Sequence, residues 1–594
     1  MWRINPFKYN RRPSQEVEIG NLLLGGTHPV RVQSMANTDT NDIENSVAQC
    51  ERIVAAGADL VRFTTQGVRE AESAKLIHNT IREIGLTTPL VADIHFNANA
   101  ADVAARHVEK VRINPGNYVG SVKIGDSSDY TDEEFEKEYQ KIRARFIPFL
   151  DICKANNTAI RIGVNHGSLS ERMMNRFGDT PQGMVASCME FLEICREQNF
   201  HNIVISMKTS NTVMMVHVVR LLVDEMEKKD MHYPLHLGVT EAGDGEDGRI
   251  KSSVGIGTLL LDGIGDTIRV SLSEEPEAEV PVARMLVEYT ELRKNGTEIN
   301  IVPSQKFSQF EYQKRETNTV GLIGGDNVPV VIAHKDGGFA TLPDFLLVDN
   351  AVKNTNGDVY PIFNTAQVND IIDSSAPVNF LRMCYSELNS DFIQLMKSQP
   401  NLVVLLDACY VNSVSEMRAF FHTLLDADCH TPVILSKTYR EKNLQDLQIK
   451  AAADLGALFV DGFGDGIFLQ NTGDITVEQI TSVAFGILQA SRVRTTKTEY
   501  ISCPSCGRTM FNLQTVIARI KARTSHLKGL KIGIMGCIVN GPGEMADADY
   551  GYVGAGRGKI SLYKKKECVE RNIPEENAVD KLIDLIKVHG DWHD

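Results

Sequence analysis

An alternation of short apolar runs and longer amphipathic stretches repeats eight times over the first 295 residues of the chain. The stretches 42–56 and 133–155 place apolar residues three or four positions apart, as helices with one buried face do. The apolar runs predict strands at 30–35, 59–65, 90–96, 110–116, 159–165, 203–210, 235–243 and 266–272. Eight strand–helix units of this size predict an α/β fold that closes as a TIM barrel.

Four of these strands carry an arginine between two apolar residues. One such arginine is usually a surface or salt-bridged residue, whereas four equivalents in a repeating fold need a common cause. Alternate strand residues share a face, so polar side chains converge at the carboxyl ends, where barrel enzymes place their sites. The converging set is Arg62, Arg112, Arg161, Asn165, Ser206, Lys208, Arg269 and Ser271. Its five cations would repel one another without an anion, and a diphosphate suits the forked donors of arginine.

The same rim holds three candidates for binding and proton transfer. Asp93 and His95 lie on one face of the third strand, and Glu241 lies at the end of the seventh. A histidine or carboxylate at a strand end can simply satisfy backbone groups. Beside a cluster of cations, we expect these three side chains to be functional.

Cysteines near the carboxyl terminus have the spacing of a metal site. Cys503 and Cys506 form a CxxC motif, and Cys537 follows some thirty residues later. Three thiolates leave one corner of an iron–sulfur cubane without a cysteine, and the Gly-Pro-Gly turn after Cys537 can bring Glu544 back toward the same metal. A structural zinc site is the alternative, but the next thiol, Cys568, lies beyond a glycine-rich hairpin. The spacing therefore favours a 4Fe-4S cluster.

The motifs CPSC and MGCIVNGPGE, together with ADIHF, VRINPGN, SMKTSN and GVTEAG in the barrel, resemble those of the 4-hydroxy-3-methylbut-2-enyl diphosphate synthase family. The resemblance implies a TIM barrel and an iron–sulfur domain with Cys503, Cys506, Cys537 and Glu544 as cluster ligands. It implies that Glu241 takes part in proton transfer and that Asn540 lies beside the substrate. It also implies that the barrel grips the diphosphate with Arg62, Arg112, Arg161, Asn165, Lys208, Arg269 and Ser271.

The reaction that this resemblance implies is the reductive ring opening and dehydroxylation of 2-C-methyl-D-erythritol 2,4-cyclodiphosphate to (E)-4-hydroxy-3-methylbut-2-enyl diphosphate, in isoprenoid precursor biosynthesis. No complete nicotinamide or flavin motif is present, so two electrons would come from an external carrier such as ferredoxin or flavodoxin. A homodimer is possible. Two alternatives stay open: a barrel enzyme acting on another phosphorylated or pterin substrate with a structural metal domain, and a non-enzymatic iron–sulfur redox sensor.

Residues 298–492 separate the barrel from the cysteine motifs and are absent from the shorter form of the family. Apolar runs predict strands at 330–333, 345–348, 402–407, 433–436 and 458–460. Residues 259–269 align without gaps on 458–468, which replaces Arg269 by Phe468. We expect a degenerate, barrel-like insert that acts as structure, as in the long three-domain form. The predicted domains are a barrel at 1–297, the insert at 298–492 and a small α+β cluster domain at 493–594.

The composition fits a soluble bacterial enzyme of the cytoplasm. The chain has 62 Lys and Arg against 77 Asp and Glu, which argues against general binding to nucleic acid or anionic membranes. No apolar run approaches transmembrane length. Most cysteines stand singly in apolar segments, as Cys50, Cys153, Cys195 and Cys409 do, so we expect buried, reduced thiols rather than disulfides.

The cluster segment is the basic part of this acidic chain. Residues 501–594 carry more Lys and Arg than Asp and Glu, and residues 564–566 are three consecutive lysines. A solvated charge run is the simple explanation. The functional explanation is that an acidic electron carrier docks on this basic segment.

Overall fold

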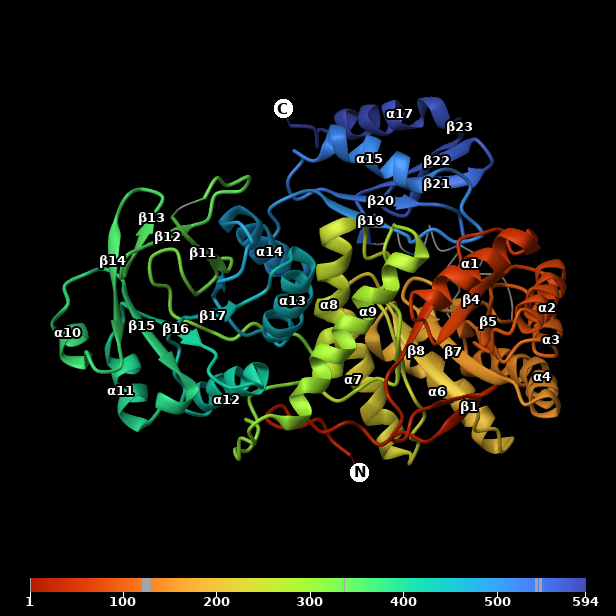
Figure 1. The fold of residues 1–594 in the computed structure, drawn as a ribbon, viewed down its shortest axis with the longest axis horizontal. Coiled ribbons are helices and arrows are strands. Elements are labelled where there is room, and N and C mark those ends of the chain that lie inside the picture. The colour runs from red at the N-terminus through yellow and green to blue at the C-terminus, as the bar shows by residue number, and fades with distance from the viewer. Residues whose placement is uncertain (1, 120–129, 336, 540–542, 544–546, 594) are drawn as a thin grey trace.

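Eight parallel strands close around one axis in the amino-terminal half of the computed structural model, which describes residues 2–119, 130–335, 337–539, 543 and 547–593 (Figure 1). The hydrogen-bonded order is β8-β7-β6-β5-β4-β3-β10-β9, and a parallel bridge between Ile205 and Leu235 joins the two ends. The strands are β3 (Arg31–Met35), β4 (Leu60–Thr65), β5 (Leu90–Ile94), β6 (Lys110–Ile113), β7 (Ala159–Asn165), β8 (Ile203–Lys208), β9 (His236–Leu237) and β10 (Thr267–Ile268). The predicted TIM barrel is confirmed.

Helices cover the outside of this first barrel. They are α1 (Ile43–Ala55), α2 (Val68–Glu83), α3 (Ala98–Ala104), α4 (Asp132–Asn156), α5 (Glu171–Phe177), α6 (Pro181–Glu197), α7 (Thr212–Lys228), α8 (Gly245–Leu261) and α9 (Pro276–Glu291). Polar residues fix where several of them begin. The side chains of Asn97, Thr180 and Asn211 accept hydrogen bonds from free N–H groups in the first turns of α3, α6 and α7.

The seventh and eighth strands are shorter than the predicted 235–243 and 266–272. The backbone at Glu241 has φ +47° and at Gly243 φ +103°, neither of which an extended strand allows. The chain therefore turns across the mouth of the barrel at this point. A hairpin that was not predicted, β1 (Val17–Ile19) and β2 (Leu22–Leu24), packs its apolar side chains against the opposite end of the barrel.

Residues 330–471 form a second closed barrel, drawn in green and teal in Figure 1. Its strands are β11 (Val330–His334), β12 (Phe345–Val348), β13 (Ala351–Asn354), β14 (Val359–Asn364), β15 (Asn379–Cys384), β16 (Leu402–Asp407), β17 (Val433–Tyr439) and β18 (Gly466–Asn471). Strand β13 is antiparallel to both neighbours, and the other pairings are parallel. The helices are α10 (Val368–Asp373), α11 (Ser390–Ser398), α12 (Ser413–Asp426), α13 (Leu444–Val460) and α14 (Val477–Ala490).

Two sequence predictions for this region are wrong. Residues 458–460 form the end of helix α13 rather than a strand, because a short buried apolar run suits either state. Cys409 is exposed and joined to Cys384 in a disulfide, since it lies in the loop after β16 and not in an apolar element. Cys50, Cys153 and Cys195 are buried free thiols, as expected.

The interiors of the two barrels differ in chemistry. Strand register places Lys208 opposite Asn165 in the first barrel and Asp407 opposite Cys384 in the second. Both pairs lie at the ends of the fifth and sixth strands of their barrels. Four residues before these ends on the fifth strand, Arg161 of the first barrel corresponds to Phe380 of the second. The inside of the second barrel is an apolar cluster that includes Val330, Ile332, Phe345, Ile362, Phe380, Val403, Leu405, Ile434 and Phe468.

Helices α8 and α13 bring the two barrels into direct contact. A Cβ added at Gly257 would lie 2.8 Å from the Cβ of Ala453, and one added at Gly456 would lie 2.6 Å from a methyl group of Val254. Small residues therefore let the two helices pack closely. Since α8 ends in the first copy of the sequence repeat, 259–269, and α13 ends in the second, 458–468, the barrels meet through equivalent elements.

Four buried ion pairs lie beside this helix contact, and two of them connect the first barrel to the second. Arg220 on α7 donates to Asp262 and Asp461, and Arg418 on α12 donates to the same two carboxylates. All four nitrogen–oxygen distances are 2.8 Å. Each aspartate thus serves one arginine from its own barrel and one from the other.

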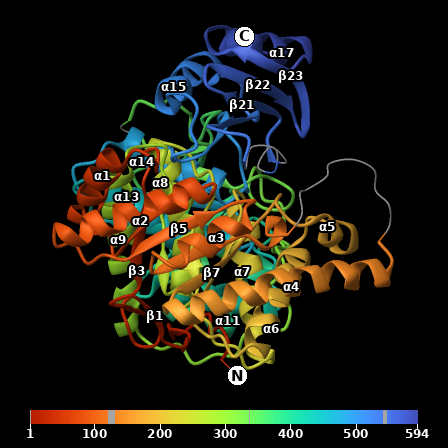
Figure 2. The same cartoon turned by 90° about the vertical axis from the view of Figure 1, so that its right-hand side faces the viewer.

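A five-stranded sheet forms the carboxyl-terminal part, in blue at the top of Figure 1. Strands β19 (Glu499–Ser502), β20 (Lys531–Met535) and β21 (Tyr550–Gly556) are parallel, whereas β22 (Lys559–Lys564) and β23 (Glu567–Pro574) extend it antiparallel. Helices α15 (Leu513–Thr524) and α17 (Glu575–Val588) share an apolar core with the sheet. Figure 2 shows this part stacked over the first barrel.

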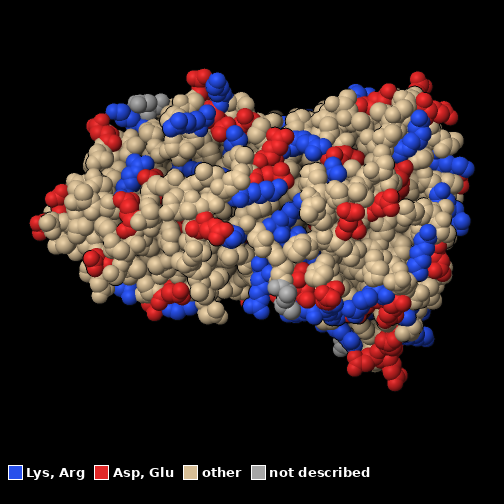
Figure 3. Space-filling view, turned by 60° about the horizontal axis from the view of Figure 1, so that its bottom comes forward, with Lys and Arg blue, Asp and Glu red and all other residues tan. Residues whose placement is uncertain are grey.

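On the face shown in Figure 3, Lys and Arg are interspersed with Asp and Glu. This face has no broad basic patch among the residues that the structure describes. Within the described ranges, no helix is both long and apolar enough to cross a membrane.

We predict that Asp461→Asn destabilises the protein by about 3–5 kcal/mol, because it leaves Arg220 and Arg418 with an uncompensated buried charge. The measurement is the midpoint of urea unfolding. The matched control is Glu298→Gln, which breaks a pair with Lys8 whose two side chains are about half exposed, and which should cost less than about 1 kcal/mol. Equal effects of the two substitutions would contradict a structural role for the buried cluster.

Candidate functional site

One cavity of about 80 Å³ lies between the carboxyl ends of the first barrel's strands and the cysteine motifs. The predicted site residues that line it are Arg62, Asp93, His95, Arg112, Arg161, Asn165, Lys208, Glu241, Arg269, Ser271, Cys503, Cys506 and Cys537. Ser206 lies directly behind this lining and hydrogen-bonds Arg161 at 3.2 Å. Asn540 and Glu544 lie outside the described residues. The two halves of the sequence prediction therefore meet in one place.

Asp93 is the negative centre of this cavity. Its carboxylate lies 3.3 Å from Arg112, 3.8 Å from Arg161 and 4.0 Å from Arg62. The His95 ring nitrogen Nε2 lies 3.2 Å from the same carboxylate. Burial alone would raise the pKa of Asp93, but Arg62, His95 and Arg112 outweigh it and hold the pKa well below the usual range. Asp93 is therefore ionised and neutralises part of the cation cluster.

Arg269 differs from the other cations because a carboxylate already holds it. Glu279 on α9 accepts hydrogen bonds from Arg269 at 2.9 and 3.0 Å. Both side chains are buried. Arg269 therefore has less free capacity for a ligand than Arg161, whose buried Nε has no hydrogen-bond partner among the described residues.

The remaining cations lack enough negative charge around them. Burial lowers the pKa of Arg62 to about 10, and Asp93 offsets this only in part. Burial and the charge of Arg161 hold the pKa of Lys208 well below its usual value. A bound anion would supply the missing charge and favour the protonated forms. The electrostatics therefore suit a polyanionic ligand.

A second polar layer under this site was not predicted. Lys110 and His236 are fully buried, and within the described part of the chain neither Lys110 Nζ nor His236 Nε2 has a hydrogen-bond partner. Burial and Arg161 hold the pKa of Lys110 well below its usual value. The period of two along β6 could have found Lys110, since it shares a face with Arg112.

The groups suited to proton transfer lie at the rim of the cavity. Burial and the charge of Arg508 lower the pKa of His95 to about 3, so its ring is neutral at physiological pH. The left-handed backbone of Glu241 brings its carboxylate near Cys503, whose thiol pKa it helps to raise. Glu241 is buried to 3 % exposure, in a position that faces both the cations and the thiols.

The three thiols fit an iron–sulfur cluster by their chemistry and surroundings. Burial, followed by repulsion from Cys506, raises the pKa values of Cys503 and Cys537. Such thiols ionise when iron compensates their charge. The N–H of Gly536 donates to the sulfur of Cys503 at 3.2 Å, a contact that favours the thiolate. The donor set is therefore suitable for a cluster.

Arg508 is a functional candidate that sequence reasoning missed. It lies two residues after Cys506, yet its guanidinium reaches across to Asp93 of the barrel at 3.8 Å. Burial alone would lower the pKa of Arg508, but the charges of Cys506, Asp93 and Cys537 outweigh it and raise the pKa. Its Nε and Nη1 are buried and have no hydrogen-bond partner among the described residues. Arg508 therefore adds a cation with free donors from the cysteine side of the cavity.

Close contacts hold the cysteine part on the barrel. Ser273 hydrogen-bonds Ser502 at 2.9 Å, and Lys251 pairs with Glu499 at 2.9 Å. The backbones of Gly167 and Gly543 approach so closely that a Cβ on either would lie 2.6 Å from the other's carbonyl oxygen. The structure is thus closed, and its cavity is far smaller than the roughly 300–1,000 Å³ of typical ligand pockets.

Two family models match the chain. One, described as the GcpE TIM-barrel domain, covers residues 14–284, and the other, described as the GcpE protein C-terminal domain, covers residues 499–588. A Parabacteroides distasonis protein named 4-hydroxy-3-methylbut-2-en-1-yl diphosphate synthase (flavodoxin) is 57% identical over 609 residues, with 99% of each chain covered. A Phocaeicola vulgatus protein of the same name is 57% identical over 611 residues, again with 99% coverage of both chains. The chain belongs to the 4-hydroxy-3-methylbut-2-en-1-yl diphosphate synthase family.

Membership of this synthase family confirms the resemblance seen in the sequence. The two family models leave residues 285–498 unmatched, while the full-length relatives cover this stretch, so they share the long form of the synthase. Among solved structures, a 7,8-dihydropteroate synthase from Vibrio fischeri is 12% identical, with 47% of this chain and 99% of that chain covered and a TM-score of 0.31.

We predict that Arg112→Ala, Arg161→Ala or Lys208→Ala weakens binding of inorganic pyrophosphate by about 1.5–3 kcal/mol each, through loss of a charge-assisted contact. Isothermal titration calorimetry measures the affinity. Arg145→Ala is the control, because Arg145 pairs with Asp102 on the outer helices, 2.7 Å away and outside the cavity. Unchanged affinity in all three cation variants would rule out the site.

Proposed function

We propose that this chain converts 2-C-methyl-D-erythritol 2,4-cyclodiphosphate to (E)-4-hydroxy-3-methylbut-2-enyl diphosphate, the reaction implied by its family, in isoprenoid precursor biosynthesis. The observation that carries the proposal is the meeting of an under-neutralised cation cluster and three thiols in one cavity. The first suits a diphosphate and the second a redox cluster. An oxidoreductase that acts on a diphosphate needs both within reach of one substrate.

We assign the cluster ligands as Cys503, Cys506, Cys537 and Glu544, with a 4Fe-4S cluster as the cofactor. When bound, such a cluster supplies electrons one at a time to a substrate held beside it. Asn540 is assigned to the substrate side of the same segment. Arg508 lies against Cys537 and Asp93, so it is placed to hold the substrate's charged end near the thiols.

On substrate binding, the diphosphate would replace the Asp93 carboxylate as the main anion in contact with the barrel cations. In the closed structure Asp93 occupies the centre of the cations. A diphosphate carries more charge and more acceptor oxygens than one carboxylate, so it can bind Arg112, Arg161 and Lys208 together. Because the closed cavity is small, the cluster domain must move away for entry and return afterwards. Closure then excludes water and strengthens the contacts.

Glu241 is the proposed proton-transfer group and His95 a neutral hydrogen-bonding group. Glu241 lies between the barrel cations and Cys503, where the substrate would span the cavity. His95 has a pKa of about 3, so it can donate from its ring N–H without adding positive charge. Glu241→Gln should therefore reduce turnover more than binding.

We propose three domains, 1–297, 298–492 and 493–594, with the second barrel as a structural support. Its apolar interior has no cations in place of Arg161 and Arg269, and its outer helices bind the first barrel. We propose a cytoplasmic location, because reduced thiols and an iron–sulfur cluster persist in a reducing compartment.

Flavodoxin is the proposed electron donor, since the names of both full-length relatives specify it. Lys565 and Lys566 are exposed at the turn between β22 and β23, whereas Lys564 is half-buried and contacts Asp591 and Tyr550. The two exposed lysines are thus free to meet an acidic carrier.

The direct test is an anaerobic assay with iron-loaded protein, the cyclic diphosphate and reduced flavodoxin. Formation of the linear diphosphate product, measured by mass spectrometry, is expected. Arg508→Ala should lower the turnover sharply, while Arg519→Ala on α15 serves as the matched control. A protein that binds a cluster and pyrophosphate but forms no product would contradict the proposal. That result would favour the redox sensor or the barrel enzyme with a pterin substrate.

We predict that Cys503→Ser, Cys506→Ser or Cys537→Ser abolishes cluster assembly, whereas Glu544→Ala retains part of the cluster and loses turnover. Thiolates bind iron more strongly than one carboxylate does. Iron content and the visible absorption band measure the cluster.

Cys568→Ser is the control for this series, because Cys568 lies on β23 outside the cavity lining. It should leave the cluster intact. Loss of the cluster in this variant, with full activity in Glu544→Ala, would show that the ligand assignment is wrong.

We predict that the double variant Lys565→Glu, Lys566→Glu slows turnover with reduced flavodoxin about tenfold or more, because charge reversal weakens steering of an acidic carrier. Activity with a small chemical reductant should stay the same. Lys397→Glu, on α11 of the second barrel, is the matched exposed control. Equal loss with both reductants would argue against a docking role.

A further inference from the structure

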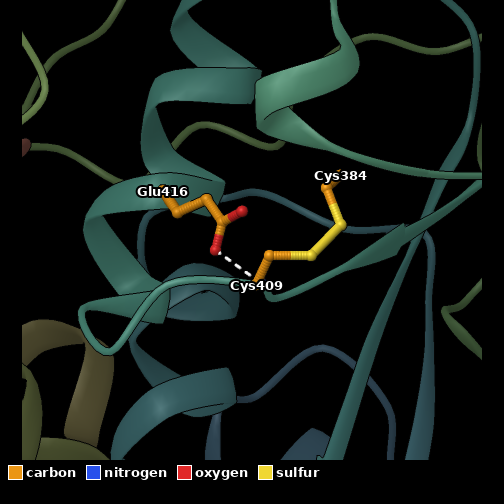
Figure 4. A group of neighbouring side chains, drawn as sticks. All are labelled: Cys384, Cys409 and Glu416. Atoms are coloured by element: carbon orange, nitrogen blue, oxygen red, sulfur yellow. Dashed lines mark hydrogen bonds between the residues drawn. A yellow bond between two sulfur atoms is a disulfide. The ribbon is translucent and has the colours of Figure 1, made fainter. Parts of the chain in front are cut away.

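The mouth of the second barrel brings together two sulfurs and a carboxylate that the proposed function does not use. Cys384 ends β15, Cys409 lies in the loop after β16, and Glu416 lies in the first turn of α12. Both sulfur atoms and a Glu416 carboxylate oxygen lie within 4.8 Å of one another. The sulfurs are joined as a disulfide, and Figure 4 shows the Glu416 carboxylate beside them.

Glu416 is buried with half of its carboxylate unsatisfied. Its Oε2 accepts hydrogen bonds from the backbone N–H groups of Cys409 and Tyr410, both at 2.8 Å. Its Oε1 is buried and has no hydrogen-bond partner within the described residues. Leaving a buried charged acceptor unpaired costs about 1–3 kcal/mol or more. This oxygen therefore calls for a donor or a cation.

A disulfide does not meet that need, because its sulfurs carry no proton and no positive charge. The reduced pair changes the chemistry of the site. Two thiolates and a carboxylate are a donor set that Zn²⁺ accepts, with metal–sulfur distances of about 2.3 Å and metal–oxygen distances of about 2.0–2.2 Å. Two ligand atoms of one such ion lie at most about 4.6 Å apart. The three ligand atoms here lie within 4.8 Å of one another, so small side-chain movements after reduction would bring them to this separation.

We propose that Cys384, Cys409 and Glu416 bind a thiophilic divalent cation such as Zn²⁺ when the disulfide is reduced. Reduction adds two electrons and two protons to the sulfurs, and the cation then displaces both thiol protons. The carboxylate oxygen without a partner becomes the third ligand. Because Cys409 is exposed, the fourth position faces solvent and holds water, as in zinc sites with three protein ligands.

The bound cation would join the end of β15 to the loop that leads into α12. The same loop contacts the first barrel, since Arg293 donates to the carbonyl of Val411. Next to it, Asn412 packs against Gly296, where an added Cβ would lie 2.8 Å from the Asn412 Cβ. The site is therefore placed to stabilise the connection between the barrels as well as the mouth of the second one.

The test uses the full-length, cluster-loaded protein under anaerobic conditions. A phosphine reductant, which is oxidised by the disulfide with uptake of oxygen from water, opens the pair. The protein is then incubated with Zn²⁺, freed of loosely bound metal by gel filtration, and assayed for zinc and iron by elemental mass spectrometry. We expect one zinc per chain beyond any bound before reduction, with the iron content unchanged.

The variants separate this site from the cysteines of the cluster domain. Cys384→Ser and Cys409→Ser should each lose the added zinc, and Glu416→Gln should weaken its binding at least tenfold while keeping the backbone hydrogen bonds. Cys429→Ser is the matched control, because Cys429 is a buried free cysteine of the same barrel. Cobalt in place of zinc should give a sulfur-to-metal absorption band that both cysteine variants lack.

Two results would overturn the proposal. One is zinc uptake that persists in the Cys384→Ser, Cys409→Ser double variant, which would place the metal elsewhere. The other is a reduced protein, shown by alkylation to carry both free thiols, that takes up no added zinc. That second result would leave the pair as a dithiol and disulfide couple without a metal.

Discussion

An excess of buried positive charge in the mouth of the first barrel governs the rest of this structure. Four cations surround Asp93, and Glu279 engages one more, so the cluster is only partly neutralised. Charges in such surroundings are costly unless they are paired. Four of the barrel cations, Arg62, Arg112, Arg161 and Lys208, lie on hydrogen-bonded strands that fix their positions. The domain that carries the cysteines adds Arg508 to the same place, so closure increases the demand for an anion.

The second barrel shows that the fold itself does not need these charges. Its eight strands also close into a barrel, although β13 is antiparallel, and Phe380 and Phe468 fill the interior in place of Arg161 and Arg269. Buried aromatic rings stabilise a barrel without the penalty of ion burial. The cations of the first barrel are therefore explained by a ligand rather than by stability. Ions that do serve stability lie at the barrel–barrel contact, where every charge has two partners.

Sequence patterns predict most of the fold, because strand and helix periods are local properties. They fail where tertiary pairing decides, as at residues 458–460, an apolar run that ends helix α13. The two-residue period of β-strands correctly predicted most of the barrel side chains that line the cavity. The same period also places Lys110 on the face of Arg112. Arg508 had no such signal, since its role depends on how one domain rests on another. Glu279 was missed for the same reason, because a helix packed outside the barrel supplies it.

The reciprocal ion cluster also limits how modular the chain can be. Arg220 and Asp262 belong to the first barrel by sequence, but half of their partners are Arg418 and Asp461 in the second. A cut near residue 297 would leave Arg220 and Asp262 with only each other as partners and would expose the closely packed face of α8 to water. The boundary visible in the sequence thus separates two lengths of polypeptide that are not two autonomous folding units.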